Sequence, residues 1–127
     1  MSGKIKVLLV DNEQDFCFFL KMNLEETGEL EVKVANDGKT GIELARTEKF
    51  NIILLDIVMP EMSGSEVGEI LINDPQTKEI PIIFLTAMVD DQDMGVDSIK
   101  EIGGNNFISK TAGVQKIVES IKNILGK

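Results

Sequence analysis

The residue best placed to do chemistry in this chain is Asp56, which ends an apolar run and is followed at once by a loop containing Pro and Gly. The run, residues 51–55, is short, rich in Ile and Leu and closed by turn residues, which is typical of a buried strand. In open parallel sheets, ligands bind at the carboxyl edge. A carboxylate fixed there can bind a metal ion or act as a nucleophile. A helix-capping role is less favoured, because Pro60 intervenes and Ser63 is a better cap.

Three other apolar runs end in polar side chains that could join Asp56. If the strands are parallel and adjacent, their carboxyl ends meet at one edge of the sheet. A divalent cation can bridge carboxylates, and a hydroxyl and an ammonium can hold a phosphoryl group. The chain places each of these groups after a predicted strand: Asp11 after residues 4–10, Thr86 after residues 81–85 and Lys110 after residues 106–109.

The elements that must position these side chains alternate between strand and helix patterns, which predicts a parallel sheet covered by helices on both faces. The expected strands are residues 4–10, 31–34, 51–55, 82–85 and 106–109. The expected helices are residues 14–26, 37–48, 63–72, 91–102 and a last helix with an apolar stripe over residues 114–125. Gly103 and Gly104 are expected to close the fourth of these helices.

The first expected helix carries more apolar side chains than one buried face needs. The side chains expected in the core, because they keep helical spacing, are Phe16, Phe19, Leu20 and Leu24. Those expected to face away from it are Cys17, Phe18 and Met22. An exposed Phe near the active edge could contact a partner helix, or it could be an ordinary surface hydrophobe. The pattern leaves both interpretations open.

Composition argues against several classes of function. The chain has 127 residues and a net charge of -9, whereas nucleic acids and anionic membranes attract cationic patches. A single cysteine permits no internal disulfide and favours a reducing, cytoplasmic location. No apolar stretch approaches the ~20 residues that span a bilayer, and the first residues lack the apolar region of a signal peptide. Because histidine is absent, the chain cannot carry its own phosphohistidine.

Four segments together resemble the receiver domain of two-component response regulators. Each closes a predicted strand, they occur in the family's order, and they extend over nearly the whole chain. The resemblance implies a flavodoxin-like, doubly wound α/β fold with five parallel strands in the order 2-1-3-4-5 and five helices, forming one domain over residues 1–127. The matching segments are residues 8–13 (LLVDNE), 54–64 (LLDIVMPEMSG), 84–87 (FLTA) and 107–110 (FISK).

The resemblance also implies a role for the strand-end residues. Asp56 would be the phosphoacceptor, whose carboxylate forms an acyl phosphate. Asp11, together with Asp56 and the backbone carbonyl of Val58, would bind Mg²⁺, which neutralises charge on the phosphoryl oxygens. The Lys110 ammonium would pair with those oxygens.

Three further residues are expected to sense or bind the phosphoryl group. By the same resemblance, Thr86 would supply the switch hydroxyl, and the backbone N–H of Ala87 would add a hydrogen bond to the phosphoryl group. Phe107, three residues before Lys110, occupies the aromatic switch position. Taken alone, Phe107 would be interpreted as a core aromatic.

Two positions depart from the family pattern. Asn12 stands where a second acid is usual, and an amide oxygen can bind a hard cation but brings no charge, so weakened Mg²⁺ binding is expected. Glu13 comes next, but on the incoming helix it is expected to point elsewhere. Thr111 follows Lys110 where the family usually has a cis proline. Because a cis bond without proline costs ~2.5–4 kcal/mol, we expect a trans bond before Thr111 and a loop conformation that differs from the one usual in the family.

The expected function is a phosphorylation-activated switch. A sensor histidine kinase or a histidine phosphotransfer protein would donate the phosphoryl group, and a downstream target or an output domain outside this chain would receive the signal. The only catalysis expected is self-phosphorylation and self-dephosphorylation. A pseudo-receiver that binds partners without phosphate is the alternative, supported by Asn12 and Thr111. A haloacid-dehalogenase-type phosphatase is disfavoured because Val58 replaces its second acid, and an FMN carrier because Trp and Tyr are absent.

Overall fold

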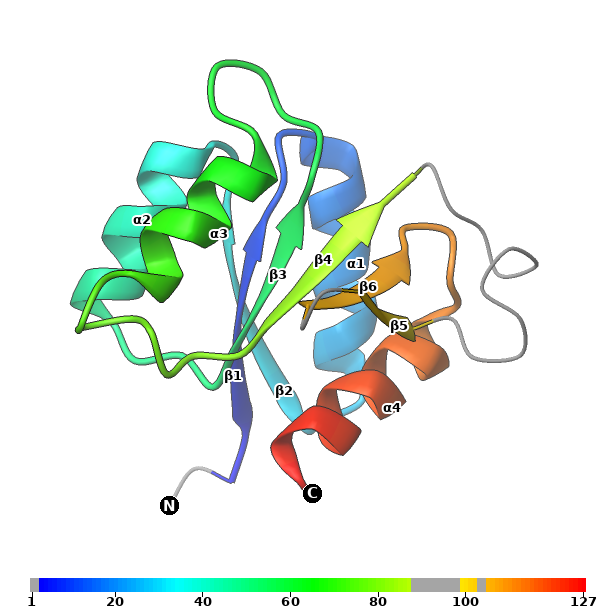
Figure 1. Ribbon diagram of the computed structural model, residues 1–127. Helices are drawn as coiled ribbons and strands as arrows, with labels where there is room; N and C mark the ends of the chain where they lie inside the picture. The colour runs from blue at the N-terminus through cyan, green and yellow to red at the C-terminus, as the bar shows by residue number, and fades with distance from the viewer. Residues whose placement is uncertain (1–2, 88–98, 103–104) are drawn as a thin grey trace.

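The computed structural model describes residues 3–87, 99–102 and 105–127. It shows one sheet with helices on both faces (Figure 1). The strands are β1 Ile5–Val10, β2 Leu30–Ala35, β3 Ile52–Asp56, β4 Ile82–Thr86, β5 Ile99–Ile102 and β6 Asn105–Ser109. The helices are α1 Gln14–Glu26, α2 Gly38–Thr47, α3 Gly64–Ile72 and α4 Val114–Leu125. None of the helices in these ranges has the length and apolarity needed to cross a bilayer.

The sheet order is β2-β1-β3-β4-β6-β5, and the first five strands in this order are parallel. Since β6 is the fifth strand expected from the sequence, the predicted parallel sheet in the order 2-1-3-4-5 is confirmed. The register pairs Val10 with Leu55, Asp56 with Leu85 and Thr86 with Ser109. These pairs bring the carboxyl ends of β1, β3, β4 and β6 to the same edge.

The strand β5 replaces part of an expected helix. The prediction of a helix over residues 91–102 is wrong for Ile99–Ile102, which pairs antiparallel with β6, with Ile102 opposite Asn105. The Gly-Gly pair predicts a helix stop, but two short runs separated by such a pair are also a hairpin signal. Residues 91–98 of that expected helix lie outside the described residues. The described part of the chain therefore contains four helices, not the five expected.

Each face of the sheet has its own apolar core. Helices α1 and α4 cover one face and α2 and α3 cover the other (Figure 1). Because successive side chains of a strand point to opposite faces, β1 sends Leu9 to the α1 side and Leu8 to the α2 side. All four residues of β3 before Asp56 are fully buried. Such an unbroken apolar run is typical of a central parallel strand covered on both faces.

Helix α1 faces the sheet with a different stripe from the one expected. Its buried residues are Cys17, Leu20 and Leu24, while Phe16 is only partly buried. Phe19, expected in the core, is 56% exposed, and Cys17, expected outside, is 2% exposed. The helix has enough apolar residues for two overlapping stripes, so spacing alone could not determine its rotation. Packing selected the stripe that contains the small Cys17, whose thiol donates to the backbone oxygen of Asp11 at 3.3 Å.

Candidate functional site

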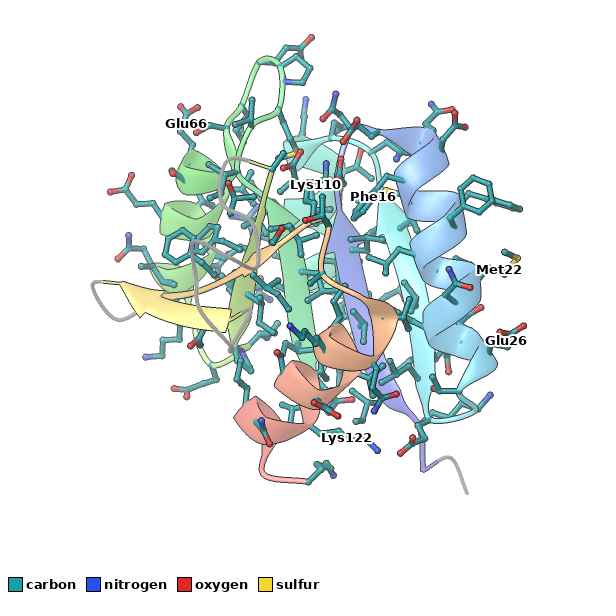
Figure 2. All side chains as sticks on the ribbon, turned by 90° about the vertical axis from the view of Figure 1, so that its right-hand side faces the viewer. Phe16, Met22, Glu26, Glu66, Lys110 and Lys122 are labelled. Carbon is teal, nitrogen blue, oxygen red and sulfur yellow. The ribbon has the colours of Figure 1, made fainter. Side chains whose placement is uncertain are left out.

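The four strand-end side chains expected at one edge meet there. Asp11, Asp56 and Thr86 are each at least 95% buried, and the side chain of Lys110 is 8% exposed. Lys110 follows β6, and its backbone N–H donates to the oxygen of Thr86 at 3.0 Å. Figure 2 shows the Lys110 side chain at this edge beside Phe16 of α1. Three ionisable groups are thus withdrawn from water within one small volume.

Asp11 is held by hydrogen bonds that also shape the turn after β1. Its Oδ1 accepts from the backbone N–H of Glu13 at 2.9 Å, which directs the chain into α1. Its backbone oxygen accepts from the Asn36 amide at 2.9 Å. Its other carboxylate oxygen, Oδ2, is fully buried and lies 2.9 Å from Lys110 Nζ, but it receives no directed hydrogen bond. This oxygen therefore keeps lone pairs available for a cation.

The carboxyl group of Asp56 lies in an environment that disfavours its charge. Burial, and after it the neighbouring carboxylate of Asp11, raise the pKa of Asp56 to about 6. Lys110 and the backbone N–H of Val58 act in the opposite direction but do not cancel these effects. The site therefore has too little positive charge to stabilise both carboxylates, and a bound cation would favour their ionised forms.

The Lys110 ammonium lies among three carboxylates. Its Nζ is 2.9 Å from Asp11 Oδ2 and 3.7 Å from Asp56 Oδ2, and it also contacts Glu13 Oε1. It lies 4.5 Å from the centre of the Phe16 ring, a cation–π distance. Burial alone lowers the pKa of Lys110, but the interactions with Glu13 and Asp11 more than offset this, so the pKa lies above its usual value and the group stays charged.

The contact of Glu13 corrects one expectation and identifies a residue that sequence reasoning missed. Glu13 was expected to point away from the site, yet its carboxylate contacts Lys110. The reason is the turn held by Asp11, which makes Glu13 the N-cap residue of α1 instead of a residue within the helix. Asn12, by contrast, is exposed. The one available signal in the sequence was the acid's position two residues after the strand-end Asp11.

The loop after Asp56 approaches the strand so closely that one position must be glycine. The N–H of Gly64 donates to the oxygen of Ile57 at 2.8 Å. A Cβ at Gly64 would lie 2.1 Å from the backbone oxygen of Asp56, well inside contact distance. Ser63 then caps α3 in a reciprocal capping box with Glu66, as the sequence predicted for Ser63. This turn determines where the backbone of Val58 lies relative to Asp56.

The loop after Lys110 is built without proline. Within the described residues no peptide bond is cis, so the expected trans bond before Thr111 is confirmed. The Ser109 hydroxyl accepts from the Thr111 N–H at 3.1 Å and lies 2.7 Å from the Thr111 hydroxyl. The Ala112 N–H donates to the Ser109 oxygen at 3.0 Å. A serine–threonine turn of this kind mimics a backbone turn and starts the path toward α4.

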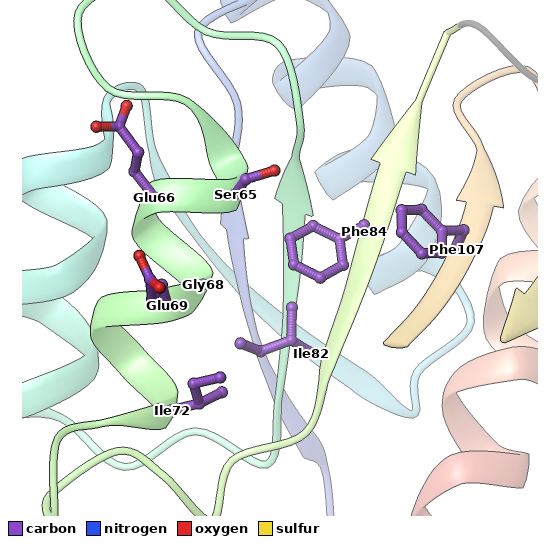
Figure 3. A pocket seen from close by; sticks show the side chains of 8 residues that line it. All are labelled: Ser65, Glu66, Gly68, Glu69, Ile72, Ile82, Phe84 and Phe107. Carbon is purple, nitrogen blue, oxygen red and sulfur yellow. The ribbon is translucent and has the colours of Figure 1, made fainter. Parts of the chain in front are cut away.

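The remaining predicted site residues lie at different depths. Thr86 ends β4 and is buried, whereas Ala87, the last described residue before the gap, is exposed. Phe107 is half-buried and stacks on Phe84 of the neighbouring strand, with ring centres 5.3 Å apart. Both rings line an open groove of about 370 Å³ beside α3 (Figure 3). Phe107 therefore faces the α3 side of the sheet.

Comparison with known families decides what kind of protein carries this arrangement. A model described as "Response regulator receiver domain" matches residues 7–122. This chain belongs to the response regulator receiver family. Receiver domains are signalling modules of two-component systems, so the resemblance seen in the sequence is confirmed.

Some relatives are as short as this receiver domain, and others are longer. It is 33% identical over 123 residues to the polar-differentiation response regulator DivK of Brucella anthropi, covering 97% of each chain. It is 30% identical to the protein PilH of Pseudomonas aeruginosa, covering 94% of this chain and 97% of that protein. It spans only 48% of the transcriptional regulatory protein PhoP of Bacillus subtilis and 24% of a probable cyclic di-GMP phosphodiesterase of Vibrio cholerae.

Solved structures share the fold. The receiver domain of the Francisella response regulator 1452 has a TM-score of 0.76 at 28% identity, with 96% of each chain covered. The chemotaxis protein CheY4 of Vibrio cholerae has a TM-score of 0.79 at 24% identity, covering 95% of this chain and 98% of that one. The receiver domain of the sensor kinase PA1611 of Pseudomonas aeruginosa, with a TM-score of 0.77, 18% identity and 98% and 99% coverage, is described with magnesium in its active-site cleft.

Proposed function

We propose that this receiver domain is a phosphorylation-activated switch that accepts a phosphoryl group on Asp56 from a phosphohistidine of a partner protein. One observation carries the proposal: Asp56 is a buried carboxylate at a strand end, with a second carboxylate and a buried ammonium beside it. No packing need explains three buried charges at one edge. Buried charges with shifted pKa values are typical of functional sites.

The chemistry requires an ionised carboxylate. With a pKa of about 6, Asp56 is largely ionised at neutral pH. Its oxygen would attack the phosphorus atom as the bond from phosphorus to the imidazole nitrogen breaks, and the bonding electrons would leave with the imidazole. The Lys110 ammonium, 3.7 Å from Asp56 Oδ2, would pair with the phosphoryl oxygens. Lys110 keeps its proton throughout, so it acts as an electrostatic partner.

The donor set fits Mg²⁺. Mg²⁺ prefers oxygen ligands and usually takes one or two carboxylates, with water and phosphate completing its shell. Asp11, through its buried Oδ2, and Asp56 would supply the carboxylates, while the Val58 carbonyl and the Asn12 amide would be the other ligands. Within the described residues, no three Asp, Glu, His or Cys side chains form a complete metal site. When bound, the ion would neutralise charge on the phosphoryl oxygens.

Three residues would transmit the effect of phosphorylation from Asp56 to the surface: Thr86, Ala87 and Phe107. The Thr86 hydroxyl and the Ala87 N–H follow β4 at the same edge as Asp56, so both could turn toward a phosphoryl group there. Phe107 lies on the next strand and packs on Phe84, which places it in the wall of the groove beside α3. We propose that movement of these residues alters a surface that a downstream target or a fused output domain recognises.

The outer face of α1 offers a contact for the donor protein. Phe18 and Phe19 are exposed and touch edge to face, with ring centres 5.5 Å apart, and Met22 is exposed one turn on. Met22 projects from the side of α1 away from the sheet (Figure 2). Because α1 begins directly after the turn of Asp11, a partner seated on this aromatic patch would stand beside the site. We propose that a sensor histidine kinase or a histidine phosphotransfer protein docks here.

The test is mass spectrometry of the intact protein after incubation with acetyl phosphate and Mg²⁺. The expected result is an added mass of one phosphoryl group, which is absent in Asp56→Asn and present in the control Asp15→Asn. Undiminished labelling of Asp56→Asn would refute the role of Asp56. No labelling of the parent protein, with intact folding, would instead favour the pseudo-receiver, a module that binds partners without phosphate.

A further inference from the structure

Glu13 stands at the start of α1, where its backbone oxygen accepts from the Cys17 N–H at 3.0 Å, but its side chain is used outside the helix. It is the N-cap residue, yet its side chain makes no capping hydrogen bond. Its carboxylate instead reaches the ammonium of Lys110, which arrives from the other end of the sequence at the end of β6. The Glu13 side chain is 61% exposed, while that of Lys110 is 8% exposed. An acid on the solvent side thus contacts the cation on which the site depends.

The contact places Glu13 in competition with whatever binds at Asp56. An ammonium has three N–H donors. Lys110 Nζ lies 2.9 Å from Asp11, in contact with Glu13, and at the longer distance of 3.7 Å from Asp56. Oxygens of a phosphoryl group on Asp56 would need a donor that now points to Glu13. The carboxylate would also repel a dianionic group that approaches from the solvent side.

We propose that Glu13 is an anionic latch on Lys110: in the unphosphorylated protein its carboxylate holds the ammonium, and an incoming phosphoryl group must displace it. The proposal rests on the proposed role of Asp56 as phosphoacceptor. Glu13 acts through Lys110, so it is a positioning residue. Because its side chain is mostly exposed, the pair breaks at modest cost, and the latch weakens phosphoryl binding without preventing it.

The neighbouring sequence explains why an acid at this position serves a separate purpose from metal binding. Asp11 faces the buried site, Asn12 is exposed, and Glu13 faces Lys110. The negative charge that Asn12 lacks at the metal site is thus present one residue later, in contact with the ammonium. A receiver arranged in this way would have weaker cation binding and a more firmly held lysine in its resting state.

The experiment compares phosphate binding by Glu13→Gln, Glu13→Asp and the parent chain. The probe is inorganic phosphate at saturating Mg²⁺, followed through the backbone amide signals of Thr86, Ala87 and Lys110 by NMR. Removing the exposed carboxylate of this ion pair should lower the dissociation constant of Glu13→Gln about two- to fivefold. Glu13→Asp keeps the charge but shortens the reach, so it should behave like Glu13→Gln. The matched control is Asp15→Asn, which removes one charge from the same helical turn and should change the constant by less than half as much.

Salt supplies a second readout that a merely structural role would not move. High ionic strength screens an exposed pair, so the ratio between the parent and Glu13→Gln should shrink toward one as NaCl is raised. An equal dissociation constant in the two proteins, or weaker binding by Glu13→Gln, would overturn the latch. A Glu13→Asp variant with the same dissociation constant as the parent would also overturn the latch. The effect would then come from the charge at position 13 and not from direct contact with Lys110.

Acetyl phosphate labelling of the same variants separates this proposal from the one on which it rests. Tighter phosphate binding in Glu13→Gln with no labelling of any variant would leave the latch standing and refute the phosphoacceptor role. Normal labelling of all variants with unchanged phosphate binding would support Asp56 as the phosphoacceptor and refute the latch. Thermal unfolding of each variant checks that the fold is retained.

Discussion

Along β1 and β3 the interior side chains are apolar and fully buried, whereas at the carboxyl edge the same two strands lead into the buried carboxylates of Asp11 and Asp56. The interior stabilises the fold, because each apolar side chain removed from water contributes about 1.5–3 kcal/mol. The edge does the opposite, since burial and mutual repulsion raise the pKa of Asp56. Under the proposed function, a cation bound at this edge would offset the repulsion between the carboxylates.

The largest expected effect is on the free energy of unfolding, when a side chain of the apolar interior is truncated. Leu54 is fully buried on β3, and Leu54→Ala should lower the free energy of unfolding by about 2–5 kcal/mol, through lost transfer energy and a cavity. Chemical denaturation measures this directly. The exposed Ile72→Ala on α3 is the control and should cost much less. Similar losses for the two variants would mean that the interior is not packed as described.

The next effect has the opposite sign. Asp56→Asn should raise the free energy of unfolding at pH 7 by about 1–3 kcal/mol, because it removes a charge whose burial is unfavourable. Asp56 binds its proton more tightly folded than unfolded, so the parent gains stability as pH falls from above 6 toward 3.8. The advantage of the variant should therefore shrink at pH 5. Added Mg²⁺ should stabilise the parent more than the variant.

Asp74 offers a control, because replacing it should change the free energy of unfolding in the opposite direction. The backbone N–H of Gln76 and the side chain of Arg46 lower the pKa of Asp74, so its charge is stabilised in the folded state. Asp74→Asn should lower stability where Asp56→Asn raises it, in denaturation curves recorded side by side. A parallel loss of stability in both variants would show that the edge carries no unfavourable charge.

A substitution at position 12 should have a smaller effect, on the affinity for a cation at this edge. Asn12→Asp should tighten Mg²⁺ binding about three- to tenfold, because a carboxylate adds attraction at short range although solvent screens it. Isothermal calorimetry measures the affinity, and the control is Asp15→Glu, which preserves charge in the following turn. Unchanged affinity would mean that position 12 does not face the metal.

The smallest effect concerns the surface. Phe18→Ser should alter the free energy of unfolding by no more than about 0.5 kcal/mol, because this ring is 64% exposed. It should slow phosphoryl transfer from the protein donor several-fold while leaving labelling by acetyl phosphate unchanged. The control is Ile72→Ser, an exposed apolar residue on α3. Equal slowing by both variants would argue against a docking role for α1.

The sequence by itself determined the parallel part of the sheet and which side chains meet at its edge. Apolar runs ending in Asp11, Asp56, Thr86 and Lys110 were sufficient to predict parallel neighbours and a shared edge, because strand periodicity and the rules of α/β connection are local signals. The trans bond before Thr111 was predictable for the same reason, since it depends only on the absence of proline.

Tertiary structure decided what depends on rotation and packing between elements. The apolar residues of α1 permit two stripes, and only contact with β2 and α4 placed Cys17 inside and Phe19 outside. As a sequence signal the Gly-Gly pair fits both a helix end and a hairpin, and the pairing of Ile99–Ile102 with β6 excludes a helix over those four residues. The contact between Glu13 and Lys110 joins residues 97 positions apart. Such a contact depends on where two loops converge in space, which no local pattern encodes.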